Sequence, residues 1–459
     1  MAKWMRSLLG AAAIGAALLV SACGGGYRAM LPGSSSSMAS ISDDDDPFRV
    51  DRIADPCADV SGEVDFRWWG GHIRGALQEE TIAVFEARYP NISVRAQPAP
   101  LDGYWDKLQI EATAGNLPDV FVVNEAWLAA LISGGVLADL AGGSAVDLTG
   151  FDDDALFSAV RGGSVYAVPA GGKAPVVLVN LDILAEAGVV VPDDTAWTWA
   201  DFLEVSALVS AAGLANGHGE RVYGLSTFGA VAEARFWAHQ SDGGMFDPSG
   251  ELRWSESSVR EFLGLARDLV DSAATPVANL QQELATVGPA ESLMAQGRSA
   301  FQFAWSNQVI GVTEFTDGIN IGVLRLPNIS NSDGGYWVTP TMFFAQSNSA
   351  SSPAAAACFL DFLVNCPDAA LVMGVDRGVP LNSELRAIVV PELEGDSAVV
   401  AHFMDEILNS NNSQPDYLPE LNDDLGRMIA VQVESVLFGL TTPGAAAASL
   451  HSNLRDSIS

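Results

Sequence analysis

The chain has 459 residues, 49% of them apolar and 17% charged, which is enough for the cores of two or three domains. Its formal net charge of −34 disfavours nucleic acids and anionic lipid headgroups as partners, because both would be repelled. The five histidines are scattered, and the zinc-helix, nucleophile-elbow and phosphate-loop patterns do not occur. The sequence therefore predicts no metal, no cofactor and no catalytic residues.

The first residues predict export. A short basic start precedes an apolar stretch over 8–20, which is too short to span a bilayer but is typical of a secretory signal. The tetrapeptide VSAC at 20–23 is similar to a bacterial lipobox, whose cysteine is acylated after cleavage. We therefore predict a lipoprotein signal peptide over 1–22, a lipid anchor on Cys23, and a flexible Gly/Ser/Asp tether over 23–60. The alternative is an ordinary signal peptide with a chance cysteine.

Three cysteines remain for disulfide bonding outside the cytoplasm. Cys358 and Cys366 flank a predicted helix, where eight positions separate two Cα atoms by about 12 Å, too far for a bridge. A disulfide would therefore join Cys57 to Cys358 or to Cys366.

Strands and helices alternate along the chain, which predicts an α/β layer architecture. The first set has strands at 64–69, 92–94 and 120–123 and helices at 77–89 and 108–114. The pattern restarts after 175, with strands at 176–179 and 223–226 and helices at 199–211 and 259–272. A second lobe is the simplest explanation of the restart.

Eight short segments follow one another in a recognisable order. They are WWGG at 68–71, YPNI at 89–92, DGYWDKL at 102–108, GNLPDV at 115–120, TWADF at 198–202, GGMFD at 243–247, AWSN at 304–307 and RGVP at 377–380. No single segment is specific, but the ordered set resembles sugar ABC-transporter solute-binding proteins of the maltose-binding-protein type (extracellular solute-binding family one). The resemblance covers about 60–459.

The resemblance implies a two-lobed periplasmic-binding-protein fold of type II, with a ligand cleft between α/β lobes joined by chain crossovers. We expect these crossovers near 171–173, 336–340 and 378–380, where Gly and Pro suit hinges. Lobe 1 would comprise 61–172 plus 339–378, and lobe 2 would comprise 173–338 plus 379–459.

The resemblance also implies the function. The chain would be the substrate-binding lipoprotein of a carbohydrate ABC importer, a monomer on the outer face of the bacterial cytoplasmic membrane. It would capture a mono- or oligosaccharide by lobe closure and deliver it to permease subunits driven by a cytoplasmic ATPase. The alternatives are a binding protein for a polyol, glycerol phosphate or polyamine, and a secreted glycoside hydrolase. Hydrolysis needs two carboxylates, and only Glu125 is expected in the cleft, so we predict no enzyme.

Sugar sites combine flat aromatic side chains with hydrogen-bonding groups. The 11 tryptophans and the lack of an evident basic cluster in the cleft favour a neutral, hydroxyl-rich ligand. From lobe 1 and the first crossover, the predicted ligand-binding residues are Trp69, Gly70, Gly71, His72, Tyr104, Asn124, Glu125 and Lys173. Glu125 is otherwise a helix-start charge, Lys173 a solvated hinge residue, and Asn124 and Tyr104 structural residues.

From lobe 2 and the later crossovers, the predicted ligand-binding residues are Arg235, Trp237, Phe303, Trp305, Asn307, Trp337 and Arg377. Trp305 either stacks on the ligand or fills the core. Arg235 and Phe236 compete with Trp237 for the position that faces the cleft. Trp337 and Arg377 either bind ligand or brace the crossovers, and a guanidinium is suited to holding vicinal hydroxyls.

Overall fold

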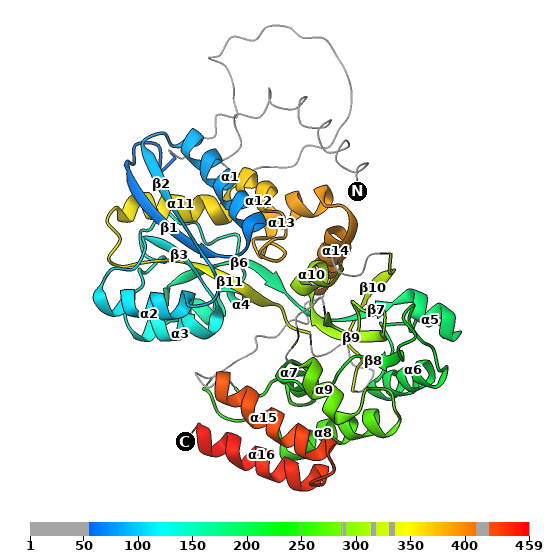
Figure 1. Cartoon of the computed structure of the whole chain (residues 1–459). Helices are drawn as coiled ribbons and strands as arrows, with labels where there is room; N and C mark the ends of the chain where they lie inside the picture. The colour runs from blue at the N-terminus through cyan, green and yellow to red at the C-terminus, as the bar shows by residue number, and fades with distance from the viewer. Residues whose placement is uncertain are drawn as a thin grey trace, which may run out of the picture.

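The computed structural model describes residues 55–458 apart from 248, 286, 288–290, 314–317, 330–335 and 410–421. The predicted signal peptide, the anchor at Cys23 and most of the predicted tether lie outside these residues. The described chain forms two lobes, each with its own β-sheet and hydrophobic core (Figure 1). The predicted two-lobed α/β fold is confirmed.

The first lobe is built on a five-stranded sheet in the order β2-β1-β3-β11-β6. Strand β1 pairs in parallel with β2 and β3, and β11 runs antiparallel to β3 and β6. All four residues of β3 are buried, as the apolar run over 120–123 predicts. The strands of this lobe are β1 Gly62–Trp69, β2 Ile92–Ala99, β3 Val120–Val123, β4 Val160–Arg161, β5 Ser164–Val165, β6 Ala167–Lys173 and β11 Thr339–Gln346, with β4 and β5 forming a separate hairpin.

In the described part of the chain, the α-helices that pack on this sheet or on each other are α1 His72–Arg88, α2 Tyr104–Ala114, α3 Glu125–Ser133, α4 Asp153–Leu156, α11 Pro353–Asn365, α12 Pro367–Met373 and α13 Ser383–Val389. In α1 the expected apolar face includes buried Ile82 and Phe85, but Gln78 and Thr81 are buried beside them. Gln78 Nε2 donates to Met373 Sδ at 2.7 Å, and Thr81 Oγ1 donates to the Leu77 carbonyl at 2.8 Å. These bonds satisfy the Gln78 Nε2 and Thr81 Oγ1 donors on the buried face.

The second lobe has a four-stranded sheet in the order β10-β7-β9-β8. Its strands are β7 Pro175–Asn180, β8 Tyr223–Leu225, β9 Ser299–Trp305 and β10 Ile321–Leu324. Its helices are α5 Leu181–Ala187, α6 Trp199–Ala211, α7 Val231–Asp242, α8 Glu256–Asp271, α9 Ala278–Leu284, α10 Val309–Thr313, α14 Gly395–Asn409, α15 Asn422–Leu437 and α16 Pro443–Ser457. Thr198 and Asp201 form a capping box that starts α6 at its predicted residue.

The segment that follows the expected return to lobe 2 at 379 contacts both cores, since Val379 belongs to the second-lobe core. Leu381 belongs to the first-lobe core, and Leu385 and Val389 of α13 pack against Ala370 of α12. The chain contacts the second-lobe core again at Val390, and α14 then packs there. We therefore place the last crossing near 390–394, because the apolar face of α13 covers α12 first.

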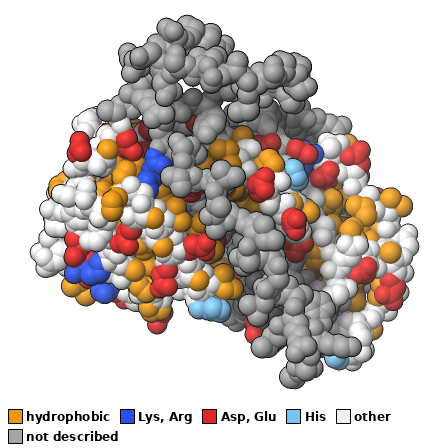
Figure 2. Space-filling view, turned by 90° about the horizontal axis from the view of Figure 1, so that it is seen from above, with side chains coloured by type: hydrophobic (Ala, Val, Ile, Leu, Met, Phe, Trp, Pro, Cys, Tyr) orange, Lys and Arg blue, Asp and Glu red, His pale blue; other side chains and the backbone are white. Residues whose placement is uncertain are grey.

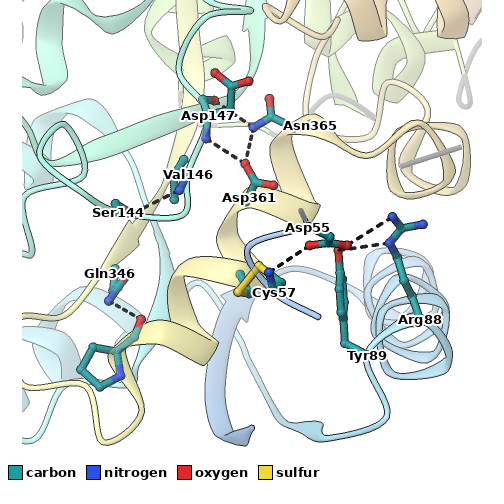
Figure 3. The surroundings of a disulfide bond; sticks show 12 residues. Asp55, Cys57, Arg88, Tyr89, Ser144, Val146, Asp147, Gln346, Asp361 and Asn365 are labelled. Carbon is teal, nitrogen blue, oxygen red and sulfur yellow. Dashed lines mark hydrogen bonds and ion pairs between the residues drawn. A yellow bond between two sulfur atoms is a disulfide. The ribbon is translucent and has the colours of Figure 1, made fainter. Parts of the chain in front are cut away.

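A disulfide joins Cys57 to Cys358, with 5.7 Å between the Cα atoms (Figure 3). It resolves the predicted alternatives in favour of Cys358. The bond connects the segment that leads into β1 with α11, so it ties the start of the described chain to the first lobe. Beside it, Tyr89 Oη donates to Asp55 Oδ2 at 3.1 Å.

Acidic side chains are spread over the face drawn in Figure 2, whereas Lys and Arg side chains gather at a few points. Within the described residues, no individual helix has the length and apolar composition of a membrane span. Helices α11 and α12 meet those criteria when taken together, with a bend of 64° between them.

Candidate ligand site at the junction of the lobes

The segments expected as crossovers lie side by side. Lys173 and Gly172 of β6 pair with Thr339 and Pro340 of β11, and Gly172 forms an isolated bridge with Val379. The Gly172 and Val379 main chains exchange two hydrogen bonds of 2.7 and 3.1 Å. A Cβ on Gly171 would lie 2.5 Å from the Arg377 carbonyl oxygen, so a larger residue there would push the segments apart.

Trp305 ends β9 at this junction and is half-buried. Its ring packs edge-on against Phe236 and Trp337, with ring centroids 5.5 and 5.7 Å away. Lys173 Nζ lies 4.7 Å from the Trp305 ring centroid, and Arg235 Cζ lies 5.7 Å from it. Both distances are within the range of a cation–π interaction. The structure therefore reveals a basic pair that the sequence did not show.

Lys173 is held in a poorly solvated place. Burial and, to a smaller extent, the nearby Arg235 charge lower the pKa of its ammonium to about 8, although the Glu125 carboxylate opposes the shift. The lysine is still mostly protonated at neutral pH. Its N–H groups are therefore hydrogen-bond donors in a site where water competes weakly.

Glu125 comes from the opposite lobe to Trp305. It stands in the first turn of α3, which Asn124 caps by accepting from the Trp127 amide at 3.0 Å. Ser158 Oγ donates to Glu125 Oε1, and Thr339 Oγ1 donates to Glu125 Oε2 at 3.5 Å. Thr339 is the strand partner of Lys173, so the carboxylate is oriented toward the same junction.

Two predicted first-lobe residues have packing roles in this conformation. Trp69 is only 8% exposed and meets Tyr104 edge-on at 5.0 Å. The Tyr104 hydroxyl donates to the Val122 carbonyl at 2.8 Å, and burial raises its pKa. Neither side chain offers a surface to a ligand here, because each is enclosed by its aromatic neighbours.

The predicted second-lobe aromatic residues, Trp305 excepted, are also core residues in this conformation. Trp237 Nε1 donates to Ser258 Oγ at 3.0 Å, and Phe303 packs against Trp199 with ring centroids 5.5 Å apart. Trp337 is fully buried and stacks on His239 at 4.0 Å. All three side chains are therefore enclosed in the second-lobe core in this conformation, and for Trp337 this agrees with the bracing alternative.

The remaining predicted residues divide between surface and interior. Gly70, Gly71, His72 and Asn307 are exposed. Arg377 is 2% exposed and points into the first lobe, so it does not present its guanidinium at the surface. Ser158 and Thr339 were missed, because nothing in the sequence marks them as partners of Glu125.

Comparisons with known proteins concern the family and the fold of the chain. The sequence profile of the bacterial extracellular solute-binding proteins matches residues 80–399. A binding protein of Brucella abortus (strain 2308) is 23% identical over 287 residues, which are 60% of this chain and 65% of that protein. The match thus spans a little under two thirds of the relative's length.

Solved structures of similar fold include two from this class. A periplasmic oligogalacturonide binding protein from Yersinia enterocolitica superposes with a TM-score of 0.71 at 19% identity, covering 86% of this chain and 99% of the other. An ABC substrate-binding protein from Listeria monocytogenes, solved with cycloalternan, gives 0.70 at 20% identity, covering 87% and 99%. Identities this low show only that the fold is shared. The family profile covers more than half of the chain and therefore shows the family. The chain belongs to the bacterial extracellular solute-binding proteins.

Proposed function

We propose that this chain is the substrate-binding lipoprotein of a carbohydrate ABC importer. It captures a mono- or oligosaccharide as a monomer, without chemistry, and delivers it to permease subunits driven by a cytoplasmic ATPase. A lipid on Cys23 holds it to the outer face of the cytoplasmic membrane. Family membership supports the binding role, and the printed ligands of the two structural neighbours, oligogalacturonide and cycloalternan, support a saccharide.

The observation that carries the proposal is the pairing of groups from both lobes at the junction. Glu125 belongs to the first lobe and Trp305 to the second, and Lys173 interacts with both. A sugar stacked on Trp305 would accept hydrogen bonds from Lys173 and donate to Glu125. Closure requires a ligand that binds the closed form better than the open form, and contacts to both lobes provide that difference.

The basic pair favours a second possibility within the same function, an acidic saccharide. Lys173 and Arg235 both lie against Trp305, and two cations beside one ring suit a carboxylate-bearing sugar as well as a neutral one. The expectation of a purely neutral ligand from composition is therefore too narrow. Uronic-acid oligosaccharides belong in the test.

The test is the melting temperature of the protein with neutral oligosaccharides, uronic-acid oligosaccharides, polyols and polyamines. A ligand at about 100 times its dissociation constant adds about 2.7 kcal/mol to the free energy of unfolding. We expect one saccharide class to raise the melting temperature, with no product by chromatography. If only polyamines or polyols raise the melting temperature, the ligand is of that class and is not a saccharide. If a sugar is turned over, the protein is a hydrolase and not a binding protein.

A further inference from the structure

The main chain fixes Lys173 beside Trp305. The residue after the lysine, Ala174, donates to Ser306 Oγ at 3.1 Å and accepts from the Ser306 amide at 2.8 Å. Ser306 directly follows Trp305, which ends β9. Lys173 Nζ lies 4.7 Å from the Trp305 ring centroid. Hydrogen-bonded backbone next to both residues therefore holds the ammonium against the ring.

The same ammonium has unused hydrogen-bonding capacity. It carries three N–H donors, and none of them has an acceptor among the described residues. Glu125, from the opposite side of the junction, acts on it through its charge but forms no ion pair with it. The Glu125 oxygens accept from Ser158 and Thr339 instead. A ligand placed between Lys173 and Glu125 can therefore use the lysine donors without breaking a bond of the protein.

The surroundings of Lys173 favour an anion over a neutral acceptor. The charged groups that act on it are Arg235 of α7 and Glu125 of α3, while its neighbours Trp305 and Thr339 do not titrate. Closing the lobes over a ligand removes more water from this half-buried side chain, which makes its charge more costly to keep. A hydroxyl supplies an acceptor but no counter-charge. A carboxylate supplies both.

We propose that Lys173 selects the ligand by charge, and that the saccharide at the junction carries a carboxylate that the lysine ammonium holds. This inference rests on the proposed function. A uronic-acid unit has the matching groups: a C–H face for Trp305, hydroxyls for Glu125 and a carboxylate on the edge of the ring. Repulsion from the Glu125 carboxylate orients the unit, so that its own carboxylate lies on the Lys173 side.

A carboxylate on Lys173 has a measurable consequence for protons. The pKa of this ammonium is about 8 without ligand, and a carboxylate against it favours the charged form and raises the pKa. At pH 8 about half of the free lysines are neutral, so binding of the acid should take up to about half a proton. A neutral sugar removes water and adds no charge, so its binding should take up no proton.

The experiment compares galacturonic-acid and glucuronic-acid trisaccharides with their methyl esters by calorimetric titration of the full-length protein. The ester keeps the rings and hydroxyls and removes the charge. We expect one acid to bind about 10–100-fold more tightly than its ester, as for a hydrogen bond to a charged group. Lys173→Met should abolish this preference. The control is Lys107→Met, which should keep it, because Lys107 is exposed on α2 and lies 4.0 Å from Glu111.

The outcomes separate this inference from the proposed function. Equal affinities for acid and ester, binding of neutral saccharides alone, or a preference that survives Lys173→Met would overturn the inference and leave saccharide binding in place. Binding of no saccharide would overturn both. If Lys173→Met does not fold, wild-type titrations at pH 8 in two buffers of different ionisation enthalpy decide. Proton uptake with the acid supports the inference, and proton release or no exchange overturns it.

Discussion

The two lobes use their tryptophans differently. In the first lobe, Trp69 meets Tyr104 edge-on, and the Tyr104 hydroxyl is satisfied by the Val122 carbonyl, so the cluster is closed. In the second lobe, Trp305 is half-buried and carries two cations against its ring. A tryptophan at a strand end can thus be either core or site. The groups around it, apolar or charged, decide which role it has.

The largest expected effect is on the closed cluster. Trp69→Ala should lower the free energy of unfolding by about 3–5 kcal/mol, because it leaves a cavity among Tyr104 and Trp127. Urea denaturation measures this change. Trp305→Ala, at a half-buried position, should cost clearly less stability. Equal losses in the two variants would remove the distinction between the lobes.

The disulfide gives the first lobe a second source of stability. Replacing Cys57 and Cys358 together by Ser should lower the free energy of unfolding by about 2–4 kcal/mol, because the unfolded chain regains the freedom of a long loop. The same denaturation experiment detects the loss. An unchanged unfolding midpoint would mean that the bond does not constrain the chain.

Saccharide affinity should depend on Trp305 of the second lobe. Trp305→Ala should weaken binding of the saccharide found in the melting panel by about 1–3 kcal/mol, or about 5–150-fold in Kd, by isothermal titration calorimetry. Trp105→Ala is the matched control, since Trp105 is also half-buried but stacks on Trp127 at 4.9 Å. An affinity loss in the control and none in Trp305→Ala would move the site into the first lobe.

The last expected effect concerns pH and one buried acid of the second lobe. Burial raises the pKa of Glu233 to about 7 from its ordinary value of 4.5. Between these values the folded protein keeps a proton that the unfolded chain releases, so this residue makes the free energy of unfolding fall as pH rises. Its slope is at most about 1.4 kcal/mol per pH unit.

Glu233→Gln should remove that contribution. The free energy of unfolding of the variant, relative to that of the wild type, should therefore increase from pH 5 to pH 8. Urea denaturation at both pH values gives the comparison. A difference that stays constant with pH would show that Glu233 titrates normally.

Much of the architecture could be predicted, because it rests on local patterns. The strand over 64–69, the buried run over 120–123 and the helix at 199–211 all appear as expected. The path of the chain after 379 could not be predicted, because Val379 and Leu381 are two residues apart and yet belong to different cores.

The site was predictable in part. Glu125, Lys173 and Trp305 were candidates by residue type and position, and the structure brings them together. The approach of Arg235 to Trp305 and the bonds from Ser158 and Thr339 to Glu125 connect residues far apart in the sequence. Such contacts leave no periodic signal. The buried tryptophans could not be separated from Trp305, because burial depends on the assembled lobes.

The central claim is that the junction of the lobes holds the ligand, and a crystal structure with the saccharide that raises the melting temperature most tests it directly. The account predicts a sugar ring against Trp305, with its polar groups on Glu125 and Lys173. A sugar bound away from these three residues, or contacting one lobe alone, would contradict it.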